Sequence, residues 1–305
     1  MGILFVCVAA LSVGIANLCM RCSIAASGSS KGYLMIQLIL SFIIVVMLYP
    51  VRSGMLTWNS TVAVVGLVGG IILGLLMLAL GKSLEKGPSG VTFAVLYSAP
   101  VLAIIVLFLA FGPDLGHEYE TQHILGTIMV VIGLVWVLIG AKHYLGTSWA
   151  GFLALMFSMS IIFFAFLKWH DLLLKPELSY SVLIPFSFTV RESQWFIPIV
   201  FLVAAAIHTS IYMVRVKQTP SGHEFLYGIL GGVLYGLAAI LILEGLRGAE
   251  MWERALAFPL FLTGIIAVCN IWGRWMYKEQ VNWRAILLCS IGVLICMTDW
   301  DFIVM

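Results

Sequence analysis

"SAPVLAIIVLFLAFG" occupies residues Ser98–Gly112, and apart from its leading Ser-Ala-Pro and its last glycine it contains only Val, Leu, Ile, Ala and Phe. A similar stretch, "AFPLFLTGIIAVCNIWG", returns at Ala257–Gly273. Long runs without charged residues are typical of membrane-spanning helices, which need about 20 apolar residues. The proline near the head of each run either bends the helix by removing a backbone donor or begins it, since proline is tolerated in a first turn.

The composition extends this interpretation to the whole chain. Of the 305 residues, 62% are hydrophobic and 10% are charged, and the mean hydropathy is +1.11. Soluble domains carry about 25% charged residues. The lipid bilayer is therefore the predicted partner, and we expect a multi-pass integral protein of the cell (inner) membrane. The net charge of +2 comes from scattered basic residues, so no nucleic-acid partner is predicted.

Ten spans are predicted, and they should be α-helices because a backbone in lipid must satisfy its own hydrogen bonds. The predicted spans are Ile3–Met20, Gly32–Val51, Val62–Leu80, Val91–Phe111, Ile124–Gly140, Ala150–Leu167, Trp195–Val214, Phe225–Leu243, Ala255–Trp275 and Ala285–Met297. Most connections are short and polar. The connection 168–194 is longer, and its apolar piece "SYSVLIPFSF" predicts an interfacial or re-entrant segment or an extension of the seventh helix. An eleventh span is the alternative.

Matching intervals indicate an internal repeat. The 33 residues from Pro100 to Gly133 recur from Pro259 to Gly292. Five spans per repeat would place the second repeat upside down relative to the first, as in many secondary transporters. The predicted fold is an all-α integral membrane protein with ten transmembrane helices as two inverted five-helix repeats, residues 1–147 and 148–305, in one membrane domain.

Glycines and cysteines are interpreted as packing residues. The motifs "GGIILG" and "GGVLYG" (residues 69–74 and 231–236) match between the halves, and small residues let helix backbones approach closely. The six cysteines lie in or beside apolar segments without metal-ligand spacing. No metal and no cofactor is expected.

Two segments carry a family resemblance. "GKSLEKGPSGVTFAVLYSAPVLAIIVLFLAFG" with "HILGTIMVVIGLVWVLIGA" (residues 81–112 and 123–141) resembles the third-to-fifth-helix pattern of the drug/metabolite transporter superfamily, in particular its EamA-like members. "FPLFLTGIIAVCNIWGRWMYKEQVNWRAILLCSIGVLICM" is similar in pattern. The resemblance implies ten helices around a cavity lined by the first, third, fourth, sixth, eighth and ninth, and export or exchange of small metabolites. The chain departs from the family at "FGPDLGHEYE", which replaces the usual Gly-Glu, and in its long central connection.

Polar groups inside spans are costly and are therefore functional candidates. Amides and phenols in lipid need a partner, whereas serines and threonines such as Ser160 and Thr263 more often bond to their own helix carbonyl. The predicted substrate-binding residues are Asn17, Tyr97, Ser98, Tyr235, Asn270 and Trp272. Glu244 is a possible coupling carboxylate, or an interfacial residue paired with Arg247 three residues on.

The predicted function is secondary transport of a small organic metabolite, amino acid-like or nucleoside-like, by alternating access as an exporter or exchanger, in a monomer or homodimer. The sequence carries no motif typical of an enzyme. The alternatives are a membrane-embedded enzyme acting on a lipid-linked substrate, for which "KWHDLLLKPE" (Lys168–Glu177) is the candidate segment, and a structural subunit. Counting of basic residues favours both termini outside, whereas the family resemblance suggests both inside.

Overall fold

The computed structural model describes residues 2–52, 54, 57–112, 120–141, 146–175, 186–216 and 218–300. In these ranges the chain is all-helical, with no strand. The elements are α1 (Gly2–Ala25), α2 (Ser30–Val46), the π-helical turn η1 (Met47–Val51), α3 (Ser60–Lys86), α4 (Ser89–Phe111), α5 (Thr121–Gly140), α6 (Thr147–Leu173), the 3-10 turn η5 (Glu192–Trp195), α7 (Phe196–Arg215), α8 (Gly222–Arg247), α9 (Met251–Tyr277) and α10 (Trp283–Met297).

Nine of the described helices are long and apolar enough to cross a membrane, and α10 is a shorter apolar helix of 15 residues. Large apolar side chains lie exposed on their outer faces, among them Val64, Leu109 and Ile139. So many exposed large apolar side chains are unusual on a soluble monomer. The chain therefore has the helices of a multi-pass membrane protein.

All ten predicted spans lie within the observed elements, and several helices run further than predicted. α3 continues through a polar last turn to Lys86, and α6 continues to Leu173. The first part of the predicted long connection is thus the end of α6, and its last part is η5. Most of the apolar piece "SYSVLIPFSF" lies outside the described residues, but Phe188 packs back on α6 and donates its amide to the Leu173 carbonyl.

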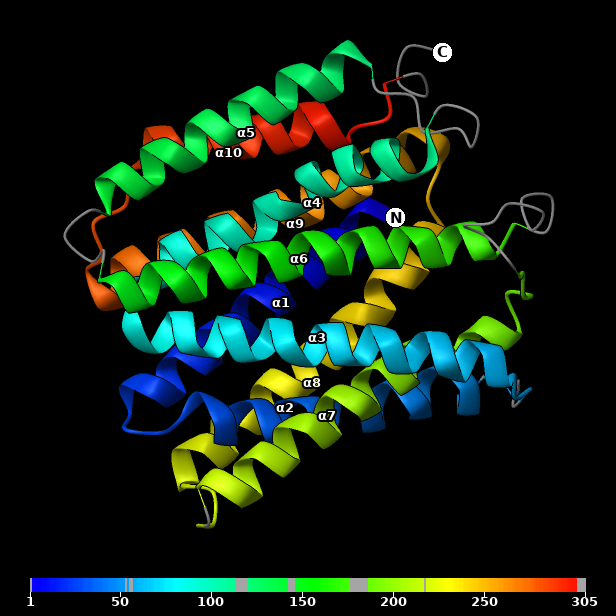
Figure 1. Ribbon diagram of the computed structural model, residues 1–305, viewed down its shortest axis with the longest axis horizontal. Coiled ribbons are helices and arrows are strands. Elements are labelled where there is room, and N and C mark those ends of the chain that lie inside the picture. Colours follow the sequence, from blue (N-terminus) through cyan, green and yellow to red (C-terminus); the bar gives the residue numbers. More distant parts are fainter. Residues whose placement is uncertain are drawn as a thin grey trace.

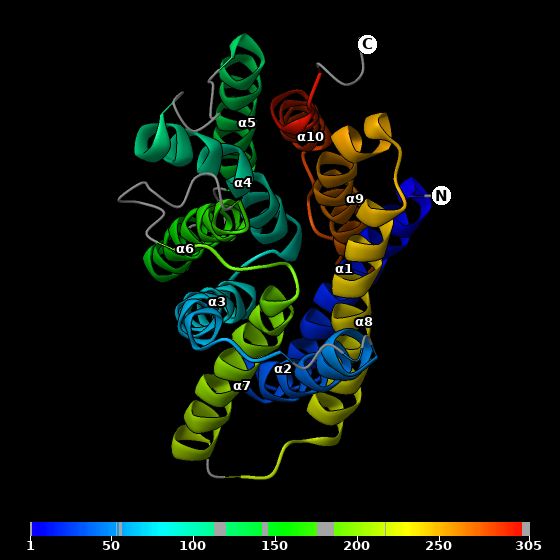
Figure 2. The same cartoon turned by 90° about the vertical axis from the view of Figure 1, so that its right-hand side faces the viewer.

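The helices form two lobes that face each other (Figure 2). α3, α4, α5, α6 and α7 make the first lobe, and α1, α2, α8, α9 and α10 make the second. In the first lobe α3 packs on α6 and α7, and α4 packs on α6; in the second α8 packs on α1 and α2, and α9 packs on α1. The α2–α7 and α5–α10 pairs join the lobes. Each lobe therefore mixes helices from both halves of the sequence.

Glycines bring the long helices into close contact, as predicted. On α3, Gly70 lies so near α7 that a Cβ atom would come within 2.5 Å of the Val203 Cβ atom. On α8, a Cβ atom at Gly232 would come within 2.7 Å of the Leu40 Cβ atom on α2. The glycines one turn to either side make equivalent contacts, which confirms their packing role.

Both prolines lie inside helices rather than at their starts. Pro100 is the twelfth residue of α4 and Pro259 the ninth residue of α9. The alternative that they merely begin helices is therefore wrong, because each helix starts well before its apolar run. Pro100 has no N–H for the Leu96 carbonyl four residues earlier, and that carbonyl instead accepts a hydrogen bond from Ser160 on α6, at 3.2 Å.

The bundle has two ends, which are named here for later use. At the clasp end α1, α3, α5, α7 and α9 finish, and α2, α4, α6, α8 and α10 begin. At the terminal end the opposite holds, so α1 begins and α10 finishes there (Figure 1).

Candidate functional site

A hydrogen bond between the two lobes lies inside the bundle. Asn17 on α1 donates its Nδ2 to the hydroxyl oxygen of Tyr97 on α4, at 2.8 Å, and both side chains are buried. Asn17 is eight residues from the end of α1 and Tyr97 eight residues from the start of α4, which places the bond ~12 Å from those helix ends. The contact joins the first and second lobes well within the span.

Two further tyrosines surround this bond. Tyr235 on α8 lies near Tyr97, and its ring meets Phe201 of α7 edge-on, with centroids 6.0 Å apart. Tyr33 on α2 is fully buried and donates its hydroxyl to the Ala16 carbonyl at 2.6 Å. Sequence reasoning missed Tyr33, although a phenol inside an apolar run was a signal, because the resemblance places the second helix away from the cavity.

The structure does not bring the other predicted residues to this cluster. Ser98 is buried on the side of α4 that faces α10, beside the Cys289 thiol. Asn270 is buried nearer the clasp end and donates to the carbonyl of Ile266 on its own helix, at 2.8 Å. Trp272 stacks edge-on with the exposed Trp275 near the end of α9.

Glu244 lies at the terminal end, away from the central cluster. Its carboxylate accepts a hydrogen bond from Arg247 at 3.0 Å, and both side chains are 52% exposed. This arrangement matches the interfacial pair that the sequence offered as the alternative to a coupling role.

Charged side chains are confined to the helix ends. In the described helices every Asp, Glu, Lys and Arg lies in the first or last two turns. His208 is the histidine deep within a described span, where its Nε2 donates to the Gly74 carbonyl at 3.2 Å in the α3–α7 contact. The surroundings of Asn17 and Tyr97 are therefore polar but uncharged.

A carboxylate at the clasp end ties the lobes together. Glu279, which follows α9, accepts hydrogen bonds from the amide and hydroxyl of Ser89 and from the amide of Gly90, at 2.8 to 2.9 Å. Both Ser89 and Glu279 are buried. The first amides of α4 have no partner within their own helix, and the helix dipole favours a negative charge there.

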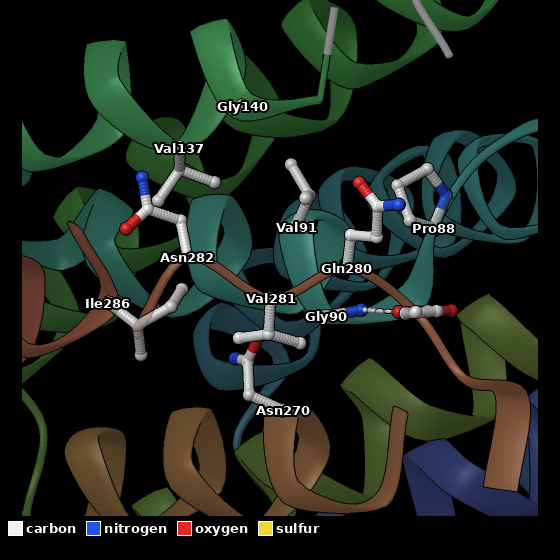
Figure 3. Close-up of a pocket in the computed structure, with 11 residues that line it drawn as sticks. Pro88, Gly90, Val91, Val137, Gly140, Asn270, Gln280, Val281, Asn282 and Ile286 are labelled. Atoms are coloured by element: carbon white, nitrogen blue, oxygen red, sulfur yellow. Dashed lines mark hydrogen bonds between the residues drawn. The ribbon is translucent and has the colours of Figure 1, made fainter. Parts of the chain in front are cut away.

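A small pocket, partly open to the outside, adjoins this carboxylate. Figure 3 shows Gly90, Asn270 and Asn282 around it, with Val137 of α5 on the opposite wall. Two of its polar groups are already engaged, as Glu279 occupies the start of α4 and Asn270 donates within its own helix. The pocket lies between the tied helix ends rather than at the central bond.

Arg21 makes a second tie at the clasp end. Its Nη1 donates to the Leu84 carbonyl at the end of α3, at 2.6 Å, and its guanidinium lies 5.2 Å from the centroid of the Tyr277 ring. The Tyr277 hydroxyl in turn donates to Cys22 Sγ at 3.2 Å. Arg21 follows Asn17 by one helical turn on α1. The same face of α1 therefore contacts the first lobe at Asn17 and again, nearer the clasp end, at Arg21.

Toward the terminal end the lobes meet through aromatic rings. Phe164 of α6 and Phe258 of α9 pack edge-on with centroids 6.2 Å apart. Phe258 precedes Cys269, which neighbours Asn17, by 11 residues or ~16 Å of helix. The central bond thus lies between the Arg21 tie on one side and an apolar contact on the other.

His170 of the segment "KWHDLLLKPE" lies beside a serine of η5. Ser193 Oγ of η5 lies 3.1 Å from His170 Nε2, and Asp171 Oδ1 lies 3.8 Å from His170 Nδ1. His170 is buried between Phe188 and Phe196, with the Phe196 ring stacked at 3.7 Å. The amides of Ser193 and Gln194 already bond to carbonyls in their own turn, so neither is free to stabilise an oxyanion.

Comparison with known proteins gives a fold match alone. No family model matches the chain, and no curated protein matches it. Among solved structures, a chain described as "Crystal structure of protein" superposes with a TM-score of 0.62 and 16% sequence identity, over 96% of this chain and 92% of that chain. At 16% identity this similarity shows a shared fold alone.

Proposed function

We propose that the protein is a secondary transporter that moves a small organic metabolite across a membrane by alternating access, as an exporter or exchanger. The observation that carries the proposal is the Asn17–Tyr97 bond, an uncharged polar contact between two lobes deep within an otherwise apolar bundle. A substrate site in such a carrier lies between its lobes, and each end must open in turn. The drug/metabolite transporter resemblance fits this proposal.

The helix pairing supports two inverted five-helix repeats within the proposal. A two-fold axis between the repeats would map each helix onto the helix five places along the chain, so α1 onto α6 and α8 onto α3. The α1–α8 pair then becomes the α6–α3 pair, and the α2–α7 and α5–α10 pairs map onto themselves. In the α5–α10 pair, Gly126 faces Gly292 and Gly133 faces Ala285. If Gly126 corresponds to Ala285 and Gly133 to Gly292, as the sequence intervals suggest, these are the reciprocal contacts of a two-fold interface.

Within the part of the chain that the structure describes, the central site offers no carboxylate for proton coupling. Glu244 is exposed and paired, and the side chains around Asn17 and Tyr97 are neutral. We therefore favour facilitation or exchange over proton-driven accumulation. Uptake into proteoliposomes should not respond to a pH gradient, and Glu244→Gln should leave it unchanged.

Alternating access can be tested without knowing the substrate. Asn17→Cys is introduced after the native cysteines are replaced by alanine, and a membrane-impermeant thiol reagent is added to either side of proteoliposomes. A short bifunctional thiol reagent with a cleavable disulfide joins Ser30→Cys to Glu85→Cys to lock the clasp end, and joins Phe164→Cys to Phe258→Cys to lock the terminal end. Each single-cysteine partner is the control.

With the clasp end locked, Asn17→Cys should react from the terminal side, and with the terminal end locked it should react from the clasp side. Reduction of each disulfide should restore reaction from both sides. Reaction from one and the same side under both locks would contradict the proposal.

The contact between Ser193 and His170 favours a second candidate, a membrane-embedded hydrolase acting on a lipid-linked ester. Asp171 is the neighbouring acid, but its 3.8 Å separation from His170 exceeds hydrogen-bonding distance. Hydrolysis of a lipid ester that is lost in both Ser193→Ala and His170→Ala, and kept in Tyr97→Phe, would favour the enzyme over the transporter.

A further inference from the structure

The Asn17–Tyr97 bond restricts which hydrogen-bonding groups a substrate can present to the site. This inference rests on the transport function proposed above. A ligand that enters between the lobes must part the bond, because it spans them. Both groups are buried, so each needs a new partner once separated. The ligand must therefore present an acceptor to the Asn17 amide and a donor or acceptor to the Tyr97 hydroxyl, close together.

The lack of charged side chains among the described residues around the Asn17–Tyr97 bond narrows the possible substrate class further. Throughout the described spans, acidic and basic side chains lie within two turns of the helix ends, and Arg21 and Glu279 are already engaged at the clasp end. A carboxylate or ammonium held at the central bond would lack a counter-charge, and an unpaired charge in an apolar interior is strongly disfavoured. Zwitterions such as free amino acids fit this site poorly.

Aromatic rings surround the bond. Phe93 stacks on Tyr97 with centroids 6.5 Å apart and planes inclined by 30°, and Phe201 meets Tyr235 from the other lobe. Toward the terminal end, the Phe164–Phe258 contact closes the path. Faces and edges of aromatic rings pack well against a flat π-system.

From these three features we infer that the site takes a neutral planar heterocycle with an amide group in its ring, of the nucleobase or nucleoside class. The ring carbonyl accepts from Asn17 Nδ2 and the adjacent ring N–H donates to Tyr97 Oη, which replaces the bond that the ligand breaks. The neighbouring rings of Phe93 and Tyr235 pack against the heterocycle. This narrows the pair of substrate classes predicted from the sequence to one.

The experiment uses the full chain in proteoliposomes with radiolabelled uracil as the probe. Orotate, which is uracil with an added carboxylate, and phenylalanine, an aromatic zwitterion, serve as competitors. We expect uracil uptake to exceed that of empty liposomes, and both competitors to inhibit it at least about tenfold more weakly than unlabelled uracil.

Tyr97→Phe and Asn17→Leu should each weaken uptake by about tenfold, the size of one lost hydrogen bond. Ser12→Ala, which removes a hydroxyl that donates to the Val8 carbonyl of its own helix α1, is the matched control.

Orotate or phenylalanine competing as well as uracil would overturn the inference, as would uracil uptake unaffected by Tyr97→Phe and Asn17→Leu. An absence of uracil uptake would also overturn it. The accessibility assay with Asn17→Cys, run in parallel proteoliposomes, separates the two proposals: alternating reaction without uracil uptake rejects the substrate class, and failure to alternate rejects the transporter itself.

Discussion

The clasp end and the terminal end close the bundle by different means. Among the described residues, hydrogen bonds join the lobes at the clasp end in three places: Arg21 with Leu84, Ser30 with Glu85, and Glu279 with both Ser89 and Gly90. At the terminal end Glu253, Arg247 and Glu192 bond within their own lobes. There the lobes meet through the Phe164–Phe258 contact and through the α5–α10 pair, where Cys296 Sγ donates to the His123 carbonyl at 3.8 Å.

The difference has an energetic consequence. Hydrogen bonds to charged groups in a buried setting are about twice as strong as neutral ones, whereas an aromatic pair contributes about 0.5–1.5 kcal/mol beyond its buried area. Hydrogen bonds of charged groups therefore join the lobes at the clasp end, whereas uncharged contacts join them at the terminal end. In an alternating-access cycle this conformation should open toward the terminal side first.

Removal of the Glu279 carboxylate should have the largest effect. Glu279→Ala leaves three donors at the start of α4 without their partner, and we expect the free energy of unfolding to fall by about 2–4 kcal/mol. Reversible unfolding in mixed micelles measures this. Glu244→Ala, at the exposed terminal-end pair, is the control and should change little. Equal losses in the two variants would remove the distinction between the ends.

Arg21→Met should loosen the clasp end without unfolding the protein. The variant loses the hydrogen bond between the lobes to the Leu84 carbonyl, which should shift the equilibrium toward an open clasp by about 1–2 kcal/mol. Spin labels on the exposed Ser148 and Lys278, one on each lobe, report the distance between the lobes at that end.

The matched control for that measurement is Arg254→Met. Arg254 lies at the terminal end and donates to the Ala249 carbonyl of its own lobe, so its loss should leave the distance distribution at the clasp end unchanged. A distribution that is unmoved in Arg21→Met would show that Arg21 does not hold the lobes together.

Phe164→Leu should have a smaller effect, confined to the terminal end. Loss of the ring contact with Phe258 weakens the apolar closure by about 1 kcal/mol. Labels on the exposed Asp171 and Met251 should then show a larger open population, while the clasp-end pair of labels stays in place. Phe225→Leu, an exposed phenylalanine on the outside of α8, should move neither distribution.

The helices could be predicted from the sequence because lipid leaves an apolar backbone few choices. The ends of α3 and α6 could not, since their polar last turns, such as Lys82–Lys86, look like loops once hydropathy alone is considered. Asn17 and Tyr97 were recognisable singly as polar groups in apolar runs. Their bond was not, because it joins positions 80 apart and depends on how α1 crosses α4.

The role of Glu279 likewise could not be predicted from the sequence. In the polar loop "YKEQVNWR" it looks like a solvated charge, yet it is buried against the start of α4. Its role depends on α9 and α4 ending at the same level of the bundle, which short-range patterns do not encode. The internal repeat in the sequence indicated that α4 and α9 are equivalent helices. It did not indicate which loop carboxylate would cap which helix.

The ends also differ in charge, which predicts the orientation in the membrane. Among the described residues, the clasp end carries eight basic and three acidic side chains: Arg21, Lys31, Lys82, Lys86, Arg215, Arg274, Lys278 and Arg284, against Glu85, Glu224 and Glu279. The terminal end carries six basic and seven acidic side chains: Arg52, Lys168, Lys175, Arg191, Arg247 and Arg254, against Glu120, Asp171, Glu192, Glu244, Glu250, Glu253 and Asp299.

Because an excess of Lys and Arg marks the cytoplasmic side, the clasp end should face the cytoplasm, and a reporter fused after Trp300 should lie on the opposite side. Alkaline phosphatase, which is active outside the cytoplasm, and green fluorescent protein, which is fluorescent inside it, give opposite readouts at that position. Arg284→Gln alone should leave both readouts unchanged, since seven other basic residues remain at the clasp end. A fluorescent fusion without phosphatase activity would reverse the orientation, and the clasp end would then be the external one.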